Sequence, residues 1–306
     1  MKKRNLLWAI PLGMMVTACG GGEETTEGET STEAEVVEEP SVQYGPFLTT
    51  EEVAETDRIE SLEDYNAIED KTTVIRYVSG AYKAPFPTEL LEAHNLQVLS
   101  INVDGELPTE LGDYKNLTTL VLGGNFTTLP ESVGELENLK AVSFEYCKDL
   151  DVNQALSVLA NCPNLQYLNL ANMGMAELPA NIGEIKNLKS LRLSGNAMAT
   201  LPDSFYTLAN LTHLRLGKNE AMDYNAVLTS GKDLPALENL WLQYCGFETL
   251  PAVLGEYPAL TKVNWREEWS DLDSDGIIAK TEKESKKFEN FDVSWNSMSG
   301  MFYDIY

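Results

Sequence analysis

A short pattern of apolar positions repeats through most of the chain. Written as LxxLxLxxN, the unit places apolar residues at positions 1, 4 and 6, and successive units are 21, 22, 26, 23, 23, 26, 23 and 28 residues apart. Positions 4 and 6 alternate as in a strand with one buried face, so Leu191 and Leu193 point one way and Arg192 the other. The units begin at Leu96, Leu117, Leu139, Leu165, Leu188, Leu211, Leu237, Leu260 and Phe288, after a degenerate unit from Thr72. Stacked coils whose leucines form one core and whose strands pair in parallel are therefore expected.

A second motif, of the form LPxxIGxLxN, follows most units. LPTELGDYKN, LPESVGELEN and LPANIGEIKN are three examples. Proline suits an irregular return segment that makes no ladder bonds. The two 26-residue coils instead contain NQALSVLANCPN and YNAVLTSGKDLPA, which predict short helices, with Cys162 in the core of the first.

Together the two motifs closely resemble the leucine-rich-repeat family, over residues 72–306. The resemblance implies an α/β solenoid, a horseshoe with a concave parallel β-sheet and a convex side of irregular segments and short helices. At position 9, Asn125, Asn196, Asn219 and Asn296 are expected to bond to backbone groups of adjacent coils, and Cys147 and Cys245 are substitutions known in the family. Asp104, Met173 and Glu268 depart from the pattern.

The N-terminus resembles a bacterial lipoprotein signal. Lys2, Lys3 and Arg4 precede an apolar run too short to span a bilayer, and the run ends in Val-Thr-Ala-Cys19. The resemblance implies a signal peptide at 1–18, acylation (palmitate) of Cys19 and an outer-membrane or cell-surface location held by the lipid anchor alone. An ordinary secretory leader cut near Ala18 is the alternative.

Residues 19–56 are predicted to form an acidic, disordered tether. From Glu23 to Asp70 there are 17 acidic residues and one basic residue, Arg58, a composition that buries too little apolar surface to fold. The acidic stretch is also similar to the surface-export signals of Bacteroidota lipoproteins, although a periplasm-facing anchor remains open. Residues 57–71 have apolar residues at helical spacing (Ile59, Leu62, Tyr65 and Ile68) and predict an N-terminal cap helix.

The 28-residue coil contains DLDSDGIIAKTE, residues 271–282, which matches the EF-hand calcium loop. The match makes Asp271, Asp273, Asp275, the carbonyl of Ile277 and bidentate Glu282 the calcium ligands, with Gly276 at the sharp turn. A single loop of this kind predicts a structural calcium ion, and the alternative is an aspartate-rich turn. The exiting helix is expected in TEKESKKF.

The concave face is the binding face that the resemblance implies. Its exposed positions collect basic and aromatic residues, types that dominate interaction hot spots. The candidates are Tyr146, Tyr167, Arg192, His213, Arg215, Lys218, Trp241, Tyr244, Arg266 and Trp295. Such a face predicts a protein partner, acidic or glycosylated; the alternatives are ordinary strand propensity and a glycan-capture module with Trp241, Tyr244 and Trp295 as stacking platforms.

Charge and composition argue against other functions. The formal net charge is −26, and losing the three basic residues of the leader would make it −29, whereas a nucleic-acid partner requires a basic surface. His94 and His213 are the two histidines and fall five units apart, and no nucleophile–base set, phosphate loop or zinc motif is visible. We therefore expect a binding protein that is not an enzyme. Three cysteines besides Cys19 predict buried thiols and no disulfide framework.

Overall fold

The computed structural model describes residues 53, 55–267, 274–288 and 290–294, all within a unit that spans Val42–Tyr306. The signal peptide, Cys19 and the tether up to residue 52 lie outside the described residues, and so do Asp271, Asp273, Trp295 and the C-terminal tail. None of the helices in the described part of the chain combines the length and apolar character needed to cross a bilayer.

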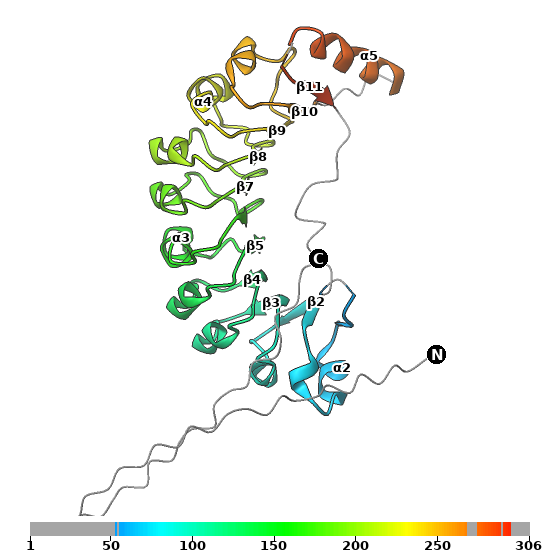
Figure 1. The fold of residues 1–306 in the computed structure, drawn as a ribbon, viewed down its shortest axis with the longest axis vertical. Helices are drawn as coiled ribbons and strands as arrows, with labels where there is room; N and C mark the ends of the chain where they lie inside the picture. Colours follow the sequence, from blue (N-terminus) through cyan, green and yellow to red (C-terminus); the bar gives the residue numbers. More distant parts are fainter. Residues whose placement is uncertain (1–52, 54, 268–273, 289, 295–306) are drawn as a thin grey trace, which may run out of the picture. The chain divides into compact units, whose positions relative to one another are not determined.

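The repeats form one parallel sheet whose strands follow chain order, as the sequence predicts. Each strand pairs with the next in matched register; for example Leu168, Leu191, Leu214 and Leu240 are successive partners. The strands are β1 (Arg58–Ile59), β2 (Arg76–Ala84), β3 (Val98–Asp104), β4 (Thr119–Asn125), β5 (Ala141–Glu145), β6 (Tyr167–Asn169), β7 (Ser190–Arg192), β8 (His213–Arg215), β9 (Asn239–Gln243), β10 (Lys262–Arg266) and β11 (Asp292–Ser294). This arrangement confirms the leucine-rich-repeat solenoid, with the strands along the inner side of the arc (Figure 1).

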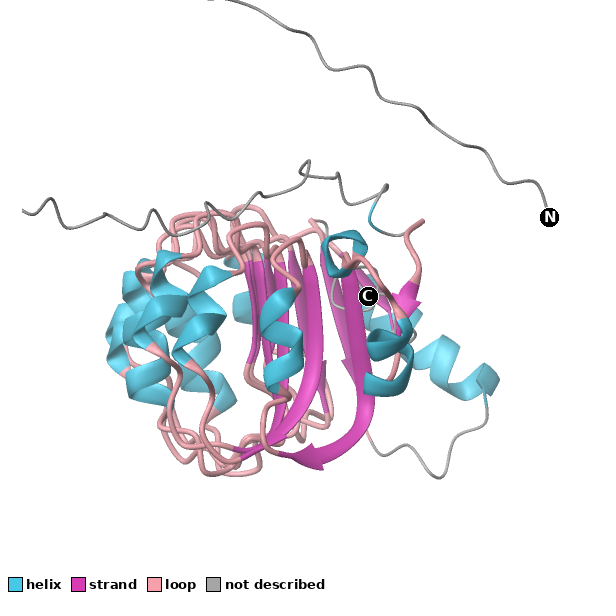
Figure 2. Ribbon diagram, turned by 90° about the horizontal axis from the view of Figure 1, so that it is seen from below, coloured by secondary structure: helices cyan, strands magenta, loops and turns pink. Residues whose placement is uncertain are grey.

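Short helices form the opposite, convex layer (Figure 2). Most are 3₁₀ helices of five residues that begin directly after the proline of a Leu-Pro pair, as at Pro179 and Pro202. Proline suits this position because its fixed φ starts the turn and its missing N–H leaves no donor unpaired. The 3₁₀ helices are η1 (Lys71–Thr73), η2 (Thr88–Glu92), η3 (Thr109–Asp113), η4 (Glu131–Glu135), η5 (Ala180–Glu184), η6 (Asp203–Thr207) and η7 (Ala252–Glu256).

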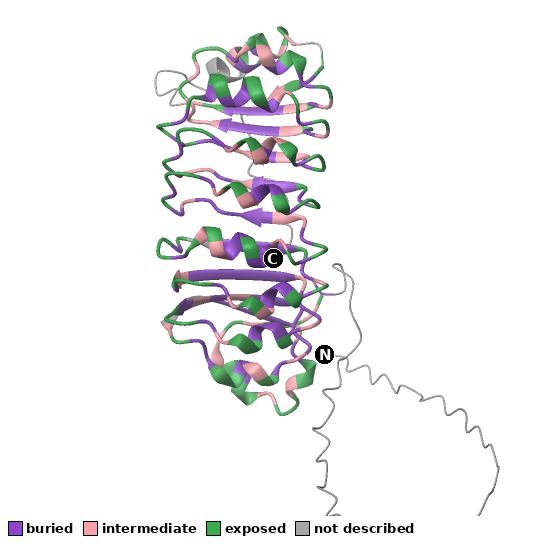
Figure 3. Ribbon diagram, turned by 90° about the vertical axis from the view of Figure 1, so that its left-hand side faces the viewer, coloured by how far each residue is buried: buried purple, intermediate pink, exposed green. Residues whose placement is uncertain are grey.

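The two 26-residue coils contain α-helices, which confirms the prediction for them. Helix α3 (Val152–Leu159) and helix α4 (Tyr224–Gly231) are N-capped by Asp151 and Asp223, whose side chains accept from the backbone N–H groups three residues on. The outward surfaces of the convex helices are exposed, while the strands behind them are buried (Figure 3).

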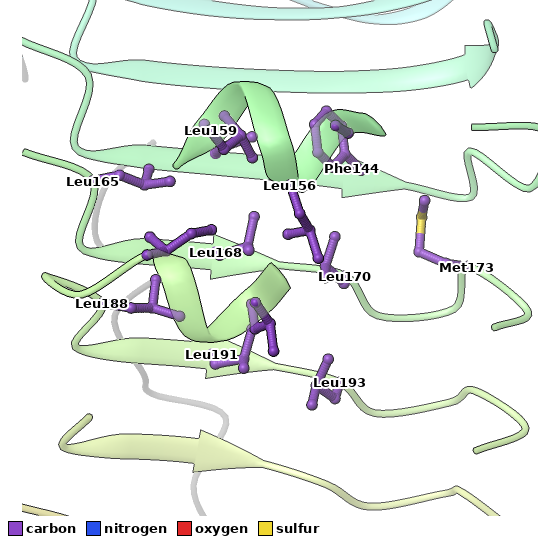
Figure 4. Packing of buried hydrophobic residues seen from close by; sticks show 14 of the residues in the cluster. Phe144, Leu156, Leu159, Leu165, Leu168, Leu170, Met173, Leu188, Leu191 and Leu193 are labelled. Atoms are coloured by element: carbon purple, nitrogen blue, oxygen red, sulfur yellow. The ribbon is translucent and has the colours of Figure 1, made fainter. Parts of the chain in front are cut away.

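The core is a continuous stack of the repeat leucines. Leu168, Leu191 and Leu193 are fully buried between the sheet and the convex helices, where Leu156 and Leu159 of α3 meet them (Figure 4). Each fully buried leucine contributes about 1.5–3 kcal/mol relative to an exposed one. No coil can bury its apolar face alone, so the stack folds as a unit.

Asparagine side chains tie successive coils together. At position 9, Asn196 donates to the carbonyls of Leu170 and Leu193, and Asn219 to those of Leu193 and Leu216, which confirms the role expected of these two. Asn125 differs, because it donates to the Asp104 carboxylate, and Asn296 lies outside the described residues. The thiol of Cys147 donates in the same way to the carbonyl of Leu122.

A second asparagine ladder was not predicted. The residue before position 1 donates to a carbonyl of the preceding coil, as Asn187 does to Pro163 and Asn210 to Lys186. Asn95, Asn138 and Asn164 make the same bond. The Asn-Leu pair that starts the units from Leu96 to Leu211 was the sequence signal for it.

The two degenerate end units were assigned two residues out of register. Arg76 pairs with Val98, a third-position residue, so the first unit begins at Val74 and not at Thr72. Asp292 pairs with Lys262, which likewise moves the last unit two residues later than Phe288. A shift of two preserves the in–out alternation, and the apolar pattern therefore cannot detect it.

The N-terminal segment differs from the expected cap helix. Arg58 and Ile59 form β1, which extends the sheet, and helix α2 is confined to Leu62–Ala67 after the N-cap Ser61. The end of the core is closed by Tyr65, whose fully buried ring packs edge-on against Tyr77 at 6.4 Å and whose hydroxyl donates to the carbonyl of Glu89.

Candidate functional site

Three of the predicted binding residues stand side by side on the strand-lined face. Arg192 pairs with Arg215, and Arg215 with Trp241, so the fifth positions of β7, β8 and β9 form one row across the sheet. Neighbouring strands are about 4.8 Å apart, which brings these long side chains within reach of one another. The repeat register alone places them together.

Trp241 is the centre of this row. The cationic carbon of Arg215 lies 4.5 Å from the centroid of its ring, and His213 stacks on it with ring centroids 5.8 Å apart at 27°. With these neighbours the side chain of Trp241 is only 7% exposed. It therefore acts mainly as a platform that orients Arg215 and His213.

The surroundings of His213 favour its neutral ring. The Thr212 hydroxyl donates to the Lys189 carbonyl, so its oxygen accepts from His213 Nδ1, 2.8 Å away. On the other side Asn239 donates to Nε2 at 3.1 Å. Burial lowers the pKa of His213, with a further lowering from Arg215 that opposes the raising effect of Glu238.

A pocket of about 160 Å³ opens beside this row. Arg192, Arg215, Lys218 and Trp241 line it together with polar and small residues. The others are Asn172, Ser194, Gly195, Gly217 and Gln243. The pocket crosses four coils and lies on the face that the sequence singled out.

The pocket is cationic in an acidic protein. Three of its lining residues carry positive charge, and no acidic residue of the described part of the chain lines it. Four ion pairs lie elsewhere, at Arg58–Glu60, Lys115–Glu135, Lys232–Glu256 and Lys287–Glu284. Arg192 Nε is buried, and none of the described residues accepts a hydrogen bond from it.

The rim of the face is built from left-handed residues at position 8 of the unit. Lys218 and Tyr244 have φ of 60° and 57°, and Asn172 and Tyr146 have 58° each. Glycine or asparagine fits this conformation readily, whereas a tyrosine or lysine there costs about 1–2 kcal/mol. The turn places the Lys218 ammonium 4.8 Å from the centroid of the Tyr244 ring.

The remaining predicted residues are spread over the same face. Tyr146 is 66% exposed and lies two coils before Arg192 in the chain, outside the pocket. Tyr167 on β6 is half-buried, and Arg266 is exposed at the end of β10. Sequence reasoning missed the uncharged residues that line the pocket. Gly195 and Gly217, which have no side chains to fill the space, could have indicated it.

The predicted calcium residues are only partly described. Helix α5 (Ser274–Ser285) contains the backbone of Asp275 and Ile277, and Glu282 is exposed on it. The helix starts earlier than the segment TEKESKKF, consistent with the helix-forming Ala279, Lys280 and Glu282. Within the described ranges no group of three or more His, Cys, Asp or Glu residues could hold a metal.

Three thiols lie in the described coils. Cys147 and Cys162 are buried, as predicted, Cys245 is half-buried, and no disulfide joins them. Burial raises the pKa of Cys162 to about 12 and that of Cys245 to about 12, so neither is a thiolate at neutral pH.

Comparison with known proteins finds similarity to leucine-rich-repeat proteins. Residues 139–274 match the family model described as a leucine-rich repeat region, and none of the curated proteins matches the chain. A leucine-rich-repeat protein of Leptospira interrogans is 22% identical over 74% of this chain and 67% of its own, with a TM-score of 0.44. The Drosophila Toll–Spatzle complex matches at 19% identity over 72% of this chain and 32% of the other, with a TM-score of 0.48. The Arabidopsis HAESA ectodomain, solved with a peptide hormone, matches at 20% identity over 69% and 36%, with a TM-score of 0.44.

Proposed function

We propose that this protein is a non-enzymatic binding module that holds a protein partner on its concave face, between β6 and β10. One observation carries the proposal. A chain with 48 acidic and 22 basic residues gathers Arg192, Arg215 and Lys218 around one pocket. A positively charged patch on a protein with a negative net charge favours the encounter with a negatively charged partner surface.

The scaffold suits this role. Solenoids use their extended inner surfaces for binding, and here the row of Arg192, Arg215 and Trp241 is fixed by sheet register. Side chains on rigid strands lose little freedom when a partner binds. Arginine and tyrosine, both present on this face, are the residue types enriched in interface hot spots.

The site offers little for catalysis. His213 lacks a nucleophile partner among its hydrogen-bonding neighbours, Thr212 and Asn239, since the Thr212 hydroxyl proton is directed to a backbone carbonyl. The raised pKa of Cys162 and that of Cys245 keep these thiols protonated. These features support a binding role.

Glycan capture is the second candidate, and Tyr146 is the observation that favours it. The side chain is 66% exposed and is held in a strained left-handed turn, as a sugar-stacking platform would require. Trp241, by contrast, is 7% exposed beneath Arg215 and His213 and cannot present an open face to a sugar.

Two further proposals rest on sequence alone. A lipid on Cys19 would anchor the protein at the outer membrane or cell surface, with residues 19–56 as the tether. A calcium ion bound by residues 271–282 would be structural: it would neutralise the carboxylates of Asp271, Asp273, Asp275 and Glu282 and stiffen the last coils.

Selection of ligands from a displayed library of protein segments, beside a glycan array, tests the binding proposal. We expect protein ligands whose binding is lost in Tyr167→Ser/Tyr244→Ser and kept in Tyr206→Ser, a convex-side variant on η6. Ligands that bind the concave variant as tightly as the wild type would overturn the proposal. Binding of glycans alone, lost in Tyr146→Ser, would establish the second candidate instead.

A further inference from the structure

The pocket beside Arg192 has the properties of a subsite for one anionic group. Its volume is about 160 Å³, and an engineered protein cavity of about 150 Å³ holds one benzene molecule. One side chain of a partner fits such a space, whereas a whole helix does not. The pocket therefore binds one chemical group of a partner. Other residues of the concave face must contact the rest of the partner.

The lining sets the charge of that group. Arg192, Arg215 and Lys218 converge on the pocket, while its other side chains are amides, a hydroxyl and the Trp241 indole. Each guanidinium offers planar, paired donors that match a carboxylate, and bonds between charged partners are roughly twice as strong as neutral ones. An uncharged occupant would leave this capacity unused.

An unsatisfied donor points to the same chemistry. Arg192 Nε is buried, and no acceptor for it exists among the described residues. A buried donor without a partner costs about 1–3 kcal/mol, and more when it is charged. An acceptor that reached this N–H from the pocket would recover that energy on binding.

Aromatic neighbours position Arg215 and Lys218 before a ligand arrives. Trp241 supports Arg215 at 4.5 Å, and Tyr244 lies under Lys218 at 4.8 Å. Gly217 packs so closely on the backbone of Gln243 that any side chain would collide with the Gln243 carbonyl oxygen. The pocket is therefore preformed and loses little entropy on binding.

We infer that the pocket of Arg192, Ser194, Arg215 and Lys218 is a carboxylate subsite, which takes an aspartate or glutamate side chain of an acidic segment of a protein partner. The inference rests on the proposed function, which it deepens by naming the chemistry of the partner. A protein carboxylate is favoured over a sulfated or uronic-acid glycan because the small pocket admits a side chain, and Trp241 offers no open face for a sugar ring.

Nuclear magnetic resonance titration of the full chain tests the inference with defined probes. The reporters are the Arg192 Nε–H signal, assigned by its loss in Arg192→Gln, and the Trp241 indole N–H signal. The probes are N-acetyl-glutamate amide, its uncharged match N-acetyl-glutamine amide, N-acetyl-glycine for a terminal carboxylate, glucuronate and sulfate. We expect saturable shifts with the blocked glutamate and none with the glutamine match.

Charge-matched variants separate the pocket from general attraction. Arg192→Gln should weaken binding of the blocked glutamate by about tenfold or more, because a charge-assisted bond is lost. Lys189→Gln removes the same charge just before β7 but outside the pocket and should change the affinity by less than about twofold. Arg192→Lys keeps the positive charge without the planar guanidinium, so its affinity for the blocked glutamate should lie between those of Arg192→Gln and Lys189→Gln.

Several results would overturn the inference. One is an equal chemical-shift change with the blocked glutamate and the blocked glutamine. Another is an equal loss of affinity in Arg192→Gln and Lys189→Gln. A third is a response to glucuronate, sulfate or N-acetyl-glycine without a response to the blocked glutamate. If selected protein ligands lose affinity in Tyr167→Ser/Tyr244→Ser but not in Arg192→Gln, the carboxylate subsite fails and the binding module stands. If neither variant affects them, both proposals fail.

Discussion

Arg215 and Trp241 are direct cross-strand partners, and the cationic carbon of the arginine lies 4.5 Å from the centroid of the indole ring. This pair links the sheet to the proposed binding face. The indole is nearly buried, yet the charge it supports faces the pocket. A change in Trp241 should therefore alter stability and recognition together.

Trp241→Ala tests that relationship. The substitution removes the support of Arg215 and His213 and leaves a space, so we expect a loss of about 2–4 kcal/mol in the free energy of unfolding. Trp241→Phe retains an aromatic platform and should lose less than half of that. Urea denaturation followed by circular dichroism measures both, and equal losses would mean that stacking contributes little.

His213 should make stability depend on pH. Burial lowers its folded-state pKa below the ordinary 6.5. The ring is therefore protonated more readily in the unfolded chain than in the folded one. The stability that it contributes is present above about pH 6.5 and is lost as the pH falls below that value.

Comparison of His213→Gln with the wild type at about pH 7.5 and pH 5.5 measures this dependence. The wild type should lose more unfolding free energy on acidification than the variant does. His94→Gln controls for the second histidine. The same pH dependence in His213→Gln and in the wild type would assign the effect to other groups.

The two asparagine positions should differ in energetic weight. Asn196 is buried; it donates to Leu170 and Leu193 and accepts from the N–H of Met175, whereas exposed Asn187 makes one bond to Pro163. Asn196→Ala should cost about 3 kcal/mol or more and Asn187→Ala about 1 kcal/mol. Denaturation curves of the two variants measure these losses. A larger loss of stability in Asn187→Ala than in Asn196→Ala would contradict the hydrogen-bonding roles described above.

Gly217 and Gly174 distinguish two reasons for glycine. Alanine at Gly217 would collide with backbone atoms of Gln243, whereas Gly174 has open space and a φ of 74°. We expect Gly174→Ala to cost about 1–2 kcal/mol through its left-handed backbone and Gly217→Ala to cost more. A Gly217→Ala variant as stable as the wild type would show that β8 and β9 can separate without penalty.

Calorimetric titration of the full protein with calcium tests the proposed calcium loop at residues 271–282. Saturable heat in the wild type, lost in Asp271→Ala and kept in Asp149→Ala, is the expected result, with an affinity near 10⁻⁴ to 10⁻³ M if the loop resembles extracellular modules. Absence of heat at millimolar calcium would mean that residues 271–282 are only an acidic segment, of which residues 274–282 belong to helix α5.

The sequence predicts the repeats well because most units carry leucines at the same positions. The register of a unit that departs from the pattern can then be assigned from the units on either side. It fails where the pattern degenerates. Thr72 and Phe288 were taken as first positions although the strand register begins two residues later, because a two-residue shift leaves the alternation unchanged. The strand at Arg58–Ile59 was missed for a related reason, since two residues carry no period.

The candidate site shows a similar division. The sequence placed Arg192, Arg215 and Trp241 on one face because strand alternation and repeat register decide that. It could not foresee that Trp241 would be nearly buried, or that Tyr146 would occupy a left-handed turn. Those features depend on side-chain packing between coils, which single-sequence periodicity does not contain.

Hydroxyl-radical footprinting of the full chain, with and without a selected protein ligand, is the most direct test of the concave face as the binding surface. The account predicts that ligand reduces oxidation of Tyr167 and Tyr244, while Tyr206 on the convex side is oxidised equally in both samples. Protection of Tyr206 with unchanged oxidation of Tyr167 and Tyr244 would place the partner on the helices and contradict the account.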